Sequence, residues 1–147
     1  MKVLVCGGRD YSDRYLVGIV LGYLGRSLTI ARVIEGDARG ADRLAGAWAR
    51  KYEIENIKFP AEWSKWGKSA GAIRNKQMLD EGQPDIVVAF PGGRGTAHMA
   101  RIAREAEVPV FEVIEEQDGP LLRSRLRNFV DYIKLGAKVF RDPILVK

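Results

Sequence analysis

Residues 85–96 read Asp85-Ile86-Val87-Val88-Ala89-Phe90-Pro91-Gly92-Gly93-Arg94-Gly95-Thr96. The first six form an apolar run rich in β-branched residues, which is typical of a buried strand. The next six form a glycine-rich turn that leads into a segment with the apolar spacing of a helix. A strand that passes through a short glycine turn into a helix is the repeating unit of an α/β fold.

The same order of strand, turn and helix recurs along the chain. Five short apolar runs are expected to form buried strands: Lys2–Cys6, Ala31–Glu35, Ile54–Phe59, Asp85–Phe90 and Val108–Val113. Segments of helical length separate them, and Asp13, Ser69 and Thr96 stand where the first, third and fourth helices should begin. This alternation predicts an α/β fold with a mainly parallel five-stranded sheet and helices on both faces.

The pattern weakens after Val113. Residues 119–133 have the apolar spacing of another amphipathic helix, and Gly136–Phe140 suggests a short final strand or a docked extension. We therefore expect one domain over residues 1–114 and a C-terminal helical extension over residues 115–147. This extension is expected to pack on the same domain or on a second copy of the chain.

The composition is that of an ordinary globular protein with one domain. The chain has 147 residues, of which 46% are apolar and 29% charged, and no apolar run is long enough to cross a bilayer. The apolar N-terminal stretch is too short for a signal peptide, so we expect a cytoplasmic protein with no membrane partner. One cysteine and one histidine, Cys6 and His98, cannot by themselves form a disulfide or a zinc cage. We expect neither a metal nor a cofactor.

The net charge of +5 suggests nucleic acid or a phosphorylated ligand as a partner. The excess is spread along the chain and forms no basic tail, so a mildly basic solvated surface accounts for most of it. The placement of particular arginines is therefore more informative than the total.

An arginine accompanies each of four segments expected near the strand ends. The segments are Gly7–Asp10, Gly36–Asp42, Ser69–Lys76 and Gly92–Thr96, and their arginines are Arg9, Arg39, Arg74 and Arg94. In an open α/β sheet such segments lie along the carboxyl edge, where ligands bind. Glycine lets backbone N–H groups approach a phosphate, and a guanidinium donates paired hydrogen bonds to phosphate oxygens. The pattern predicts a site for an anionic, nucleotide-like ligand, although short turns need glycine in any case.

The spacing of these residues excludes the common nucleotide motifs. Residues 7–12 do not fit G-x-G-x-x-G, and Glu62 stands where a P-loop ending in Gly67-Lys68-Ser69 needs its first glycine. Residues 67–71 match the G-x-S-x-G of serine hydrolases. That motif requires an immediate turn from strand to helix, whereas Ser69 lies about ten residues beyond the expected strand end. Ser69 is expected to cap a helix instead.

Together these segments resemble the SLOG superfamily, which includes the DNA-processing proteins of the Smf/DprA type and the "Lonely guy" phosphoribohydrolases. The likeness is strongest to the YspA-like, YpsA-related group and covers about residues 1–114. It rests on Gly7–Asp10, Gly36–Asp42, Arg74–Lys76 and Pro91–Thr96. The resemblance implies a Rossmann-like three-layer sandwich in which a proline-glycine-glycine loop holds the nucleotide phosphate.

The resemblance also identifies candidate site residues. Those expected to bind ligand are Gly7, Gly8, Arg9, Asp10, Gly36, Arg39, Gly40, Asp42, Arg74, Asn75, Gly92, Gly93, Arg94, Gly95 and Thr96. In the phosphoribohydrolases a glutamate stands three residues after the motif threonine, and Met99 occupies that position here. Methionine cannot manage a proton or stabilise an oxocarbenium-like centre, so whether the protein is an enzyme stays open. The catalytic residue is unknown, with Arg74, His98 and Asp10 as candidates.

Several other side chains near these segments have more than one interpretation. His98 is a substitute general acid, a contact to adenine or ribose, or an ordinary helix residue. Trp63 and Trp66 either stack on a base or cover the sheet edge and pack against the third helix. Trp48 and Cys6 are expected to serve packing.

Two functions from different classes follow. The first is binding of a nucleotide or nucleotide-derived phosphate at the carboxyl edge by a ligand sensor, a sequestering protein or an N-glycosidic hydrolase. The alternative is a single-stranded DNA-binding module of the Smf/DprA type. It is suggested by the net charge, by the loop at residues 63–68 and by Arg123, Arg125 and Arg127. A homodimer that shares the crevice is a further expectation.

Overall fold

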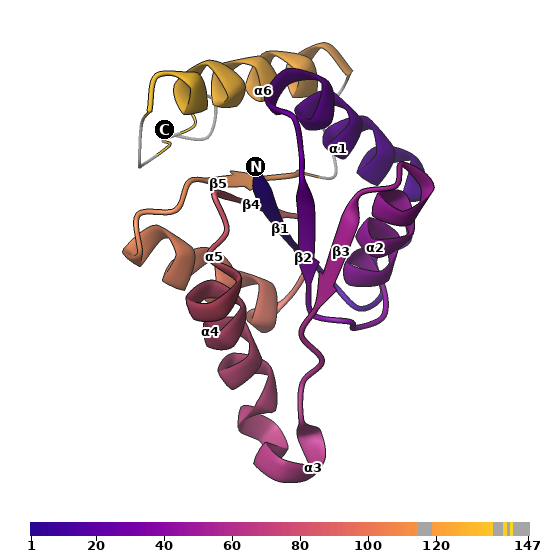
Figure 1. The fold of residues 1–147 in the computed structure, drawn as a ribbon, viewed down its shortest axis with the longest axis vertical. Helices are drawn as coiled ribbons and strands as arrows, with labels where there is room; N and C mark the ends of the chain where they lie inside the picture. The colour runs from indigo at the N-terminus through magenta and orange to yellow at the C-terminus, as the bar shows by residue number, and fades with distance from the viewer. Residues whose placement is uncertain (115–118, 137–139, 141, 143–147) are drawn as a thin grey trace.

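A computed structural model describes residues 1–114, 119–136, 140 and 142. The elements are β1 (Lys2–Cys6), α1 (Arg14–Leu28), β2 (Arg32–Glu35), α2 (Ala41–Lys51), β3 (Glu55–Lys58), α3 (Trp63–Trp66), the 3-10 turn η1 (Gly67–Ser69), α4 (Ala70–Gly82), β4 (Ile86–Ala89), α5 (Arg94–Glu105), β5 (Val110–Glu112) and α6 (Gly119–Lys134). The strands form one parallel sheet in the order β3-β2-β1-β4-β5 (Figure 1). The predicted α/β fold with a C-terminal helical extension is confirmed. None of the described helices has the length and apolar character needed to span a membrane.

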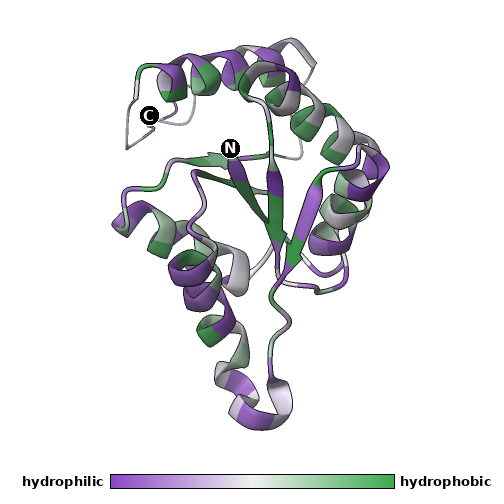
Figure 2. Ribbon diagram, viewed as in Figure 1, coloured by the Kyte–Doolittle hydropathy of each residue, from purple (hydrophilic) through white to green (hydrophobic). Residues whose placement is uncertain are grey.

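Helices cover both faces of the sheet. Side chains of each strand alternate between the two faces, so Val3 and Val5 of β1 pack with α1, α2 and α6, whereas Leu4 and Cys6 pack with α4 and α5. Figure 2 shows apolar residues within the central strands, mainly hydrophilic residues along the edge strand β3, and helices that carry both polar and apolar residues. The result is the predicted three-layer sandwich.

The structure corrects three local predictions. Residues 63–68, expected to form a loop, make the short helix α3 and most of the turn η1. Strand β3 is half-exposed rather than buried, because it lies at the edge of the sheet beside β2. Helix α5 begins at Arg94 with Gly93 at its N-cap, so Thr96 lies inside the first turn rather than before it. Asp13 caps α1 as expected, since its side chain accepts a first-turn N–H at 2.9 Å, and Ser69 precedes α4 without a capping bond from its side chain.

The C-terminal helix α6 packs on the same core as α1. Phe129 is fully buried there, and the ring of Phe140 lies 5.0 Å from that of Phe129. The buried Arg125 pairs with Asp142 and donates to a backbone carbonyl of β5 at 2.6 Å. The short final strand expected over Gly136–Phe140 falls mostly outside the described part of the chain.

The strand order creates one crevice-forming edge. Strands β1 and β4 are neighbours in the sheet, although β2 and β3 come between them in the sequence. The turns that follow β1 and β4 therefore lead to helices on opposite faces of the sheet. These two turns touch where they start, and Gly8 N donates to Pro91 O at 2.9 Å. The turn between β2 and α2 and the segment from α3 to α4 complete the same edge, with α3 at the far tip of the molecule (Figure 1).

Candidate functional site

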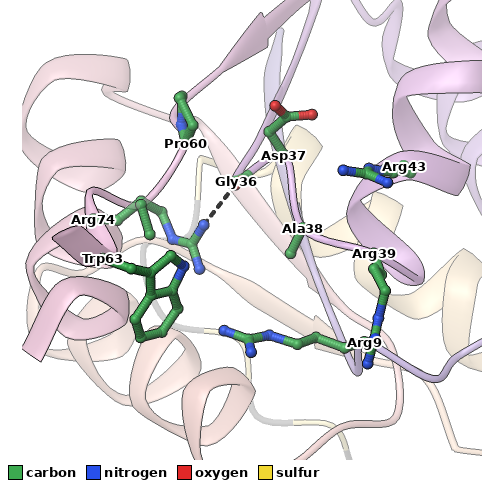
Figure 3. A pocket seen from close by; sticks show the side chains of 10 residues that line it. Arg9, Gly36, Asp37, Ala38, Arg39, Arg43, Pro60, Trp63 and Arg74 are labelled. Atoms are coloured by element: carbon green, nitrogen blue, oxygen red, sulfur yellow. Dashed lines mark hydrogen bonds between the residues drawn. The ribbon is translucent and has the colours of Figure 1, made fainter. Parts of the chain in front are cut away.

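Two adjoining hollows open at the carboxyl edge of the sheet. The large hollow, of about 570 Å³, lies beyond β1 and β4 against α4 and the first turn of α5. The small hollow, of about 350 Å³, lies over the turn between β2 and α2 (Figure 3). Arg9, Ala38, Trp63 and Arg74 line both hollows and form a shared wall.

Most residues predicted to bind ligand line one of these hollows. The large hollow is lined by Gly7, Gly8, Arg9, Asp42, Arg74, Asn75, Gly93, Arg94, Gly95 and Thr96, and by the catalytic candidate His98. The small hollow is lined by Arg9, Gly36, Arg39 and Arg74. Asp10, Gly40 and Gly92 line neither, and the Asp10 side chain is 98% exposed in an ion pair with Arg39. The arginines that we expected around one crevice are therefore divided between two.

Close packing explains why glycine occupies some of these positions. A Cβ atom at Gly92 would collide with Thr96 Oγ1 and lie 2.7 Å from Gly8 N. Gly40 has a φ of +76°, and a Cβ atom there would collide with Gly8 O. Such glycines allow the turns after β1, β2 and β4 to touch one another, so they need no ligand to account for them.

Gly93 and Gly95 differ, because nothing in the protein lies within 4 Å of where their Cβ atoms would be. Gly93 is the N-cap of α5, Gly95 belongs to its first turn, and both line the large hollow. At Gly95, inside the helix, alanine would be preferred over glycine by up to about 1 kcal/mol, whereas at the N-cap position of Gly93 glycine is itself preferred over alanine. Neither packing nor helix preference therefore explains Gly95, whereas a ligand that approaches the backbone of α5 would.

An anion would be more favourable at the start of α5 than at the starts of α1 and α2. Gly93 has no side chain to accept a first-turn N–H, and the positive Arg94 is the first residue of the helix. A cation at a helix N-terminus is unfavourable by about 0.3–1 kcal/mol. By contrast, the side chain of Asp13 caps α1, and at the start of α2 the N–H group of Ala41 already donates to Gly8 O at 3.2 Å. An anion at α5 would meet free N–H groups, the helix dipole and the Arg94 guanidinium together.

Two buried carboxylates support the turn between β2 and α2. Asp42 Oδ2 accepts hydrogen bonds from the N–H groups of Gly36 at 3.1 Å and Ala38 at 3.2 Å, and Glu35 Oε2 accepts from Asp37 N at 2.9 Å. Burial raises the pKa of Glu35 to about 7 and that of Asp42 to about 6, although these hydrogen bonds oppose the shift. Asp42 therefore holds the turn in place. Sequence reasoning missed Glu35, whose only signal is a charge at the end of an apolar run.

Arg74 and Asn75 tie α4 to the turns on either side of it. Arg74 Nη1 donates to Gly36 O at 2.6 Å, and its Nε donates to Asn75 Oδ1 at 3.2 Å. Asn75 Nδ2 donates to Gly95 O at 3.0 Å and lies 3.1 Å from His98 Nδ1. These contacts fix the first turn of α5 against α4, so the wall of the large hollow is formed before any ligand arrives.

His98 lines the large hollow as a neutral imidazole. Asn75 Nδ2 has only protons to give, so His98 Nδ1 accepts and the ring proton lies on Nε2. The orientation of the amide is set because its oxygen accepts from Arg74. Burial and the charge of Arg101 both lower the pKa of His98. This environment suits a hydrogen-bond donor to ligand better than a general acid at neutral pH.

Met99 is fully buried among the residues that pack α5 on the sheet. The position that holds a glutamate in the phosphoribohydrolases therefore faces the core here. Cys6 also belongs to this cluster, as expected, and burial raises the pKa of its thiol. Neither residue offers an ionised group to the large hollow.

Trp63 and Arg9 lie next to each other in the wall that the two hollows share. The Arg9 guanidinium lies 4.9 Å from the centre of the Trp63 ring, and Figure 3 shows the Arg9 side chain reaching toward Trp63 and Arg74. Trp63 packs on α4, because a Cβ atom at Gly71 would be 3.5 Å from its Cη2, yet its side chain is 47% exposed. Trp66 is 44% exposed and carries Lys65 over its ring at 4.9 Å.

Sequence reasoning missed several of the lining residues. In the small hollow they are Asp37, Arg43, Pro60 and Ala61, and in the large hollow they include Ala38, Gly71, Ala72 and Met78. Arg43 had a signal, because it stands beside the predicted Asp42 in the first turn of its helix. Gly71 and Ala72 also had a signal, since they lie inside the predicted segment Ser69–Lys76. Met78 had none, because its place depends on how α4 packs beside α5. Among the described residues, no three His, Cys, Asp or Glu side chains gather so as to hold a metal ion.

The fold and these hollows define a Rossmann-like α/β protein with two basic hollows at the carboxyl edge of its sheet. The chain belongs to the YspA, cpYpsA-related SLOG family, which residues 1–66 match. The gene 61 protein of Mycobacterium phage D29 is 39% identical over 118 residues, which are 75% of this chain and 94% of that protein.

Two solved structures share the fold. DNA processing protein A (DprA) from Streptococcus pneumoniae matches with a TM-score of 0.62 at 19% identity, over 95% of this chain and 58% of its own. The UDP-GlcNAc 2-epimerase from Neisseria meningitidis, solved with UDP-GlcNAc bound, matches with a TM-score of 0.53 at 18% identity, over 88% of this chain and 39% of its own. This chain spans less than two thirds of either, and at such identities the likeness concerns the fold alone.

Proposed function

We propose that this protein binds a nucleotide or nucleotide-derived phosphate in the large hollow, with the phosphate at the first turn of α5. The observation that carries the proposal is Gly95, which lines the hollow beside the N-cap Gly93 and which neither packing nor helix preference explains. The two glycines leave the N–H groups of the turn accessible, and Arg94 adds a guanidinium to the same place.

The charges around the large hollow support an anionic ligand. Arg9, Lys68, Arg74 and Arg94 line it, and of the described residues that do so Asp42 is the one carboxylate. Asp42 is buried and accepts two backbone hydrogen bonds, and the positive charge of Arg74 acts on it. Such a basic, partly enclosed surface attracts anions and strengthens each hydrogen bond to them.

Binding without cleavage fits this geometry better than hydrolysis of an N-glycosidic bond. Hydrolysis needs a carboxylate or a substitute near the bond that breaks, and Met99 lies in the core. His98 is held neutral and offers a donor rather than a base on its free nitrogen. We therefore favour a ligand sensor or a sequestering protein over a phosphoribohydrolase.

Calorimetry with nucleoside mono- and diphosphates, cyclic nucleotides and ADP-ribose derivatives tests the proposal. Arg94→Ala should weaken binding by about tenfold or more, which is the loss of a charge-assisted hydrogen bond. The matched control is Arg101→Ala, seven residues further along α5, where the arginine pairs with Glu105 and lines neither hollow. Absence of binding by the wild type, or equal binding by both variants, would contradict the proposal. Chromatography of each bound nucleotide for released base tests whether it is also cleaved.

A second candidate function is binding of single-stranded DNA, favoured by the exposed Trp63 and Trp66 with Lys65 and Lys68 beside them. Arg125 no longer supports it, because that side chain is buried. Fluorescence anisotropy of a labelled single-stranded oligonucleotide should then show binding that weakens steeply between about 50 and 200 mM salt.

The variant that isolates this second function is Trp66→Ala, because Trp66 lines neither hollow. The control is Tyr15→Ala, which removes an exposed aromatic side chain of α1. Loss of oligonucleotide binding in Trp66→Ala alone, with nucleotide binding intact, would support the DNA-binding function. Indifference to the oligonucleotide at low salt would eliminate it.

A further inference from the structure

The small hollow carries a concentration of positive charge that a single phosphate at α5 does not use. Four arginines line it: Arg9 from the turn after β1, Arg39 from the turn before α2, Arg43 from the first turn of α2, and Arg74 from α4 (Figure 3). Arg39 and Arg43 line the small hollow and not the large one, whereas Arg94 lines only the large one. The two hollows thus have separate sets of cations on either side of their shared wall.

Little negative charge in the small hollow compensates these arginines. Asp37 is the one carboxylate among the described residues that line it, and its Oδ1 lies 3.7 Å from Lys58 Nζ. The partner of Arg39 is Asp10, in a pair whose side chains are 67% and 98% exposed, and such a pair is weak and readily exchanged.

Repulsion within the shared wall adds to this imbalance. Burial lowers the pKa of Arg74, and the positive charge of Arg9 lowers it further, while the buried carboxylates of Asp42 and Glu35 oppose both effects. An anion placed between the two guanidiniums would relieve their repulsion and accept hydrogen bonds from both.

We infer that the small hollow is a second anion subsite and that the ligand carries two separate anionic groups. One group would lie at the first turn of α5, and the other would lie against Arg39 and Arg43. Trp63, exposed on the wall between them, would contact the base or sugar that joins the two groups. The ligand class is therefore a nucleoside 3′,5′-bisphosphate or a 5′-phosphorylated dinucleotide rather than a mononucleotide. This inference rests on the function proposed above.

Calorimetry on matched ligand pairs tests the second subsite. For each base, the affinity of the nucleoside 5′-monophosphate is compared with those of the 3′,5′-bisphosphate and the 5′-phosphorylated dinucleotide. The wild type should bind at least one of the two larger ligands about tenfold or more tightly than the monophosphate, since the second anion gains hydrogen bonds to charged donors.

Arg43→Ala should remove most of that gain and leave the affinity for the monophosphate unchanged. The matched control is Arg50→Ala, seven residues further along α2. This substitution removes the same charge, but Arg50 contacts Asn56 and lines neither hollow. The control should keep the gain, which separates a local subsite from the general attraction of a basic protein. Circular dichroism checks that both variants fold.

The failures of the two proposals are distinguishable. If the monophosphates bind but neither larger ligand binds more tightly, or if the gain survives Arg43→Ala, the second subsite is refuted and the proposed function stands. If the gain is lost equally in Arg50→Ala, the subsite is likewise refuted. If no nucleotide of any kind binds, both are refuted.

Discussion

Replacing Gly95 with alanine should stabilise the fold and weaken ligand binding at the same time. Gly95 lies in the first turn of α5, and a Cβ atom there would meet no protein atom within 4 Å. Exchanging glycine for alanine in a helix lowers the conformational entropy of the unfolded chain at no steric cost, which is worth about 0.5–1 kcal/mol. For a chain of this size that gain raises the melting temperature by roughly 1–4 °C.

The same methyl group would stand in the large hollow, where the proposed phosphate approaches the backbone of α5. Keeping the anion away from one N–H group should cost about one charge-assisted hydrogen bond, or tenfold or more in affinity. Two other glycines provide controls. Gly18→Ala in α1 also meets open space and should stabilise without any effect on binding, whereas Gly92→Ala collides with Thr96 and should destabilise by about 1–3 kcal/mol.

Urea unfolding and calorimetric titration of these three variants and the wild type give both quantities. We expect Gly95→Ala and Gly18→Ala both to be more stable than the wild type, and only Gly95→Ala to bind nucleotide more weakly. If Gly95→Ala binds nucleotide as the wild type does, the glycine is not there for a ligand and the argument for the site at α5 fails. If Gly95→Ala is less stable than the wild type, the space around this position is not open and the premise is wrong.

Three further predictions concern buried groups. Arg125→Leu should cost about 3–5 kcal/mol in urea unfolding, because it leaves Asp142 buried without its cation, whereas the exposed Arg123→Ala should change stability by less than about 0.5 kcal/mol. Burial raises the pKa of Glu35 from 4.5 to about 7, so the folded state holds a proton that the unfolded state releases, and this group lowers stability as the pH rises through that range. Glu35→Gln should therefore gain stability relative to the wild type between these pH values, and a constant difference would refute the assignment. The Cys6 thiol should resist alkylation at pH 8 until urea unfolds the chain, because burial raises its pKa, and mass spectrometry of the labelled protein measures this.

The order and kind of the strands and of the longer helices could be predicted because local patterns carry them, whereas the short α3 and η1 lie where a loop was expected. The apolar run Lys2–Cys6 became β1 with the same bounds, and residues 119–133 became α6 with one more residue at its end. The errors lie where tertiary position decides. Strand β3 is half-exposed because it ended at the sheet edge, which its own residues do not specify. Thr96 suits a helix N-cap by its chemistry, but Gly93 takes that place because the chain turns earlier.

The sequence could also predict where the two hollows lie, because strand ends can be recognised in the sequence and parallel strands share one carboxyl edge. The role of each residue there could not be predicted. Gly92 and Gly93 are adjacent and identical in sequence, yet one is packed against Thr96 and the other faces open space. Likewise Arg39 and Arg94 were expected to bind one anion, but in the structure they line different hollows. Such distinctions arise from contacts between turns that are far apart in the chain.

The two hollows should contribute to recognition in different ways because they differ in how firmly their groups are held. Asn75 fixes the first turn of α5 through Gly95 O, so an anion there meets N–H groups that lose little freedom on binding. The side chains of Arg39 and Arg43 are exposed and long, and ordering them costs about 0.5–1.5 kcal/mol each. On the two proposals made above, the large hollow would supply the basal affinity, and the small hollow would add affinity only for a ligand with a second anionic group. Such a protein would discriminate among phosphates by the arrangement of its charges, which the net charge of +5 does not reveal.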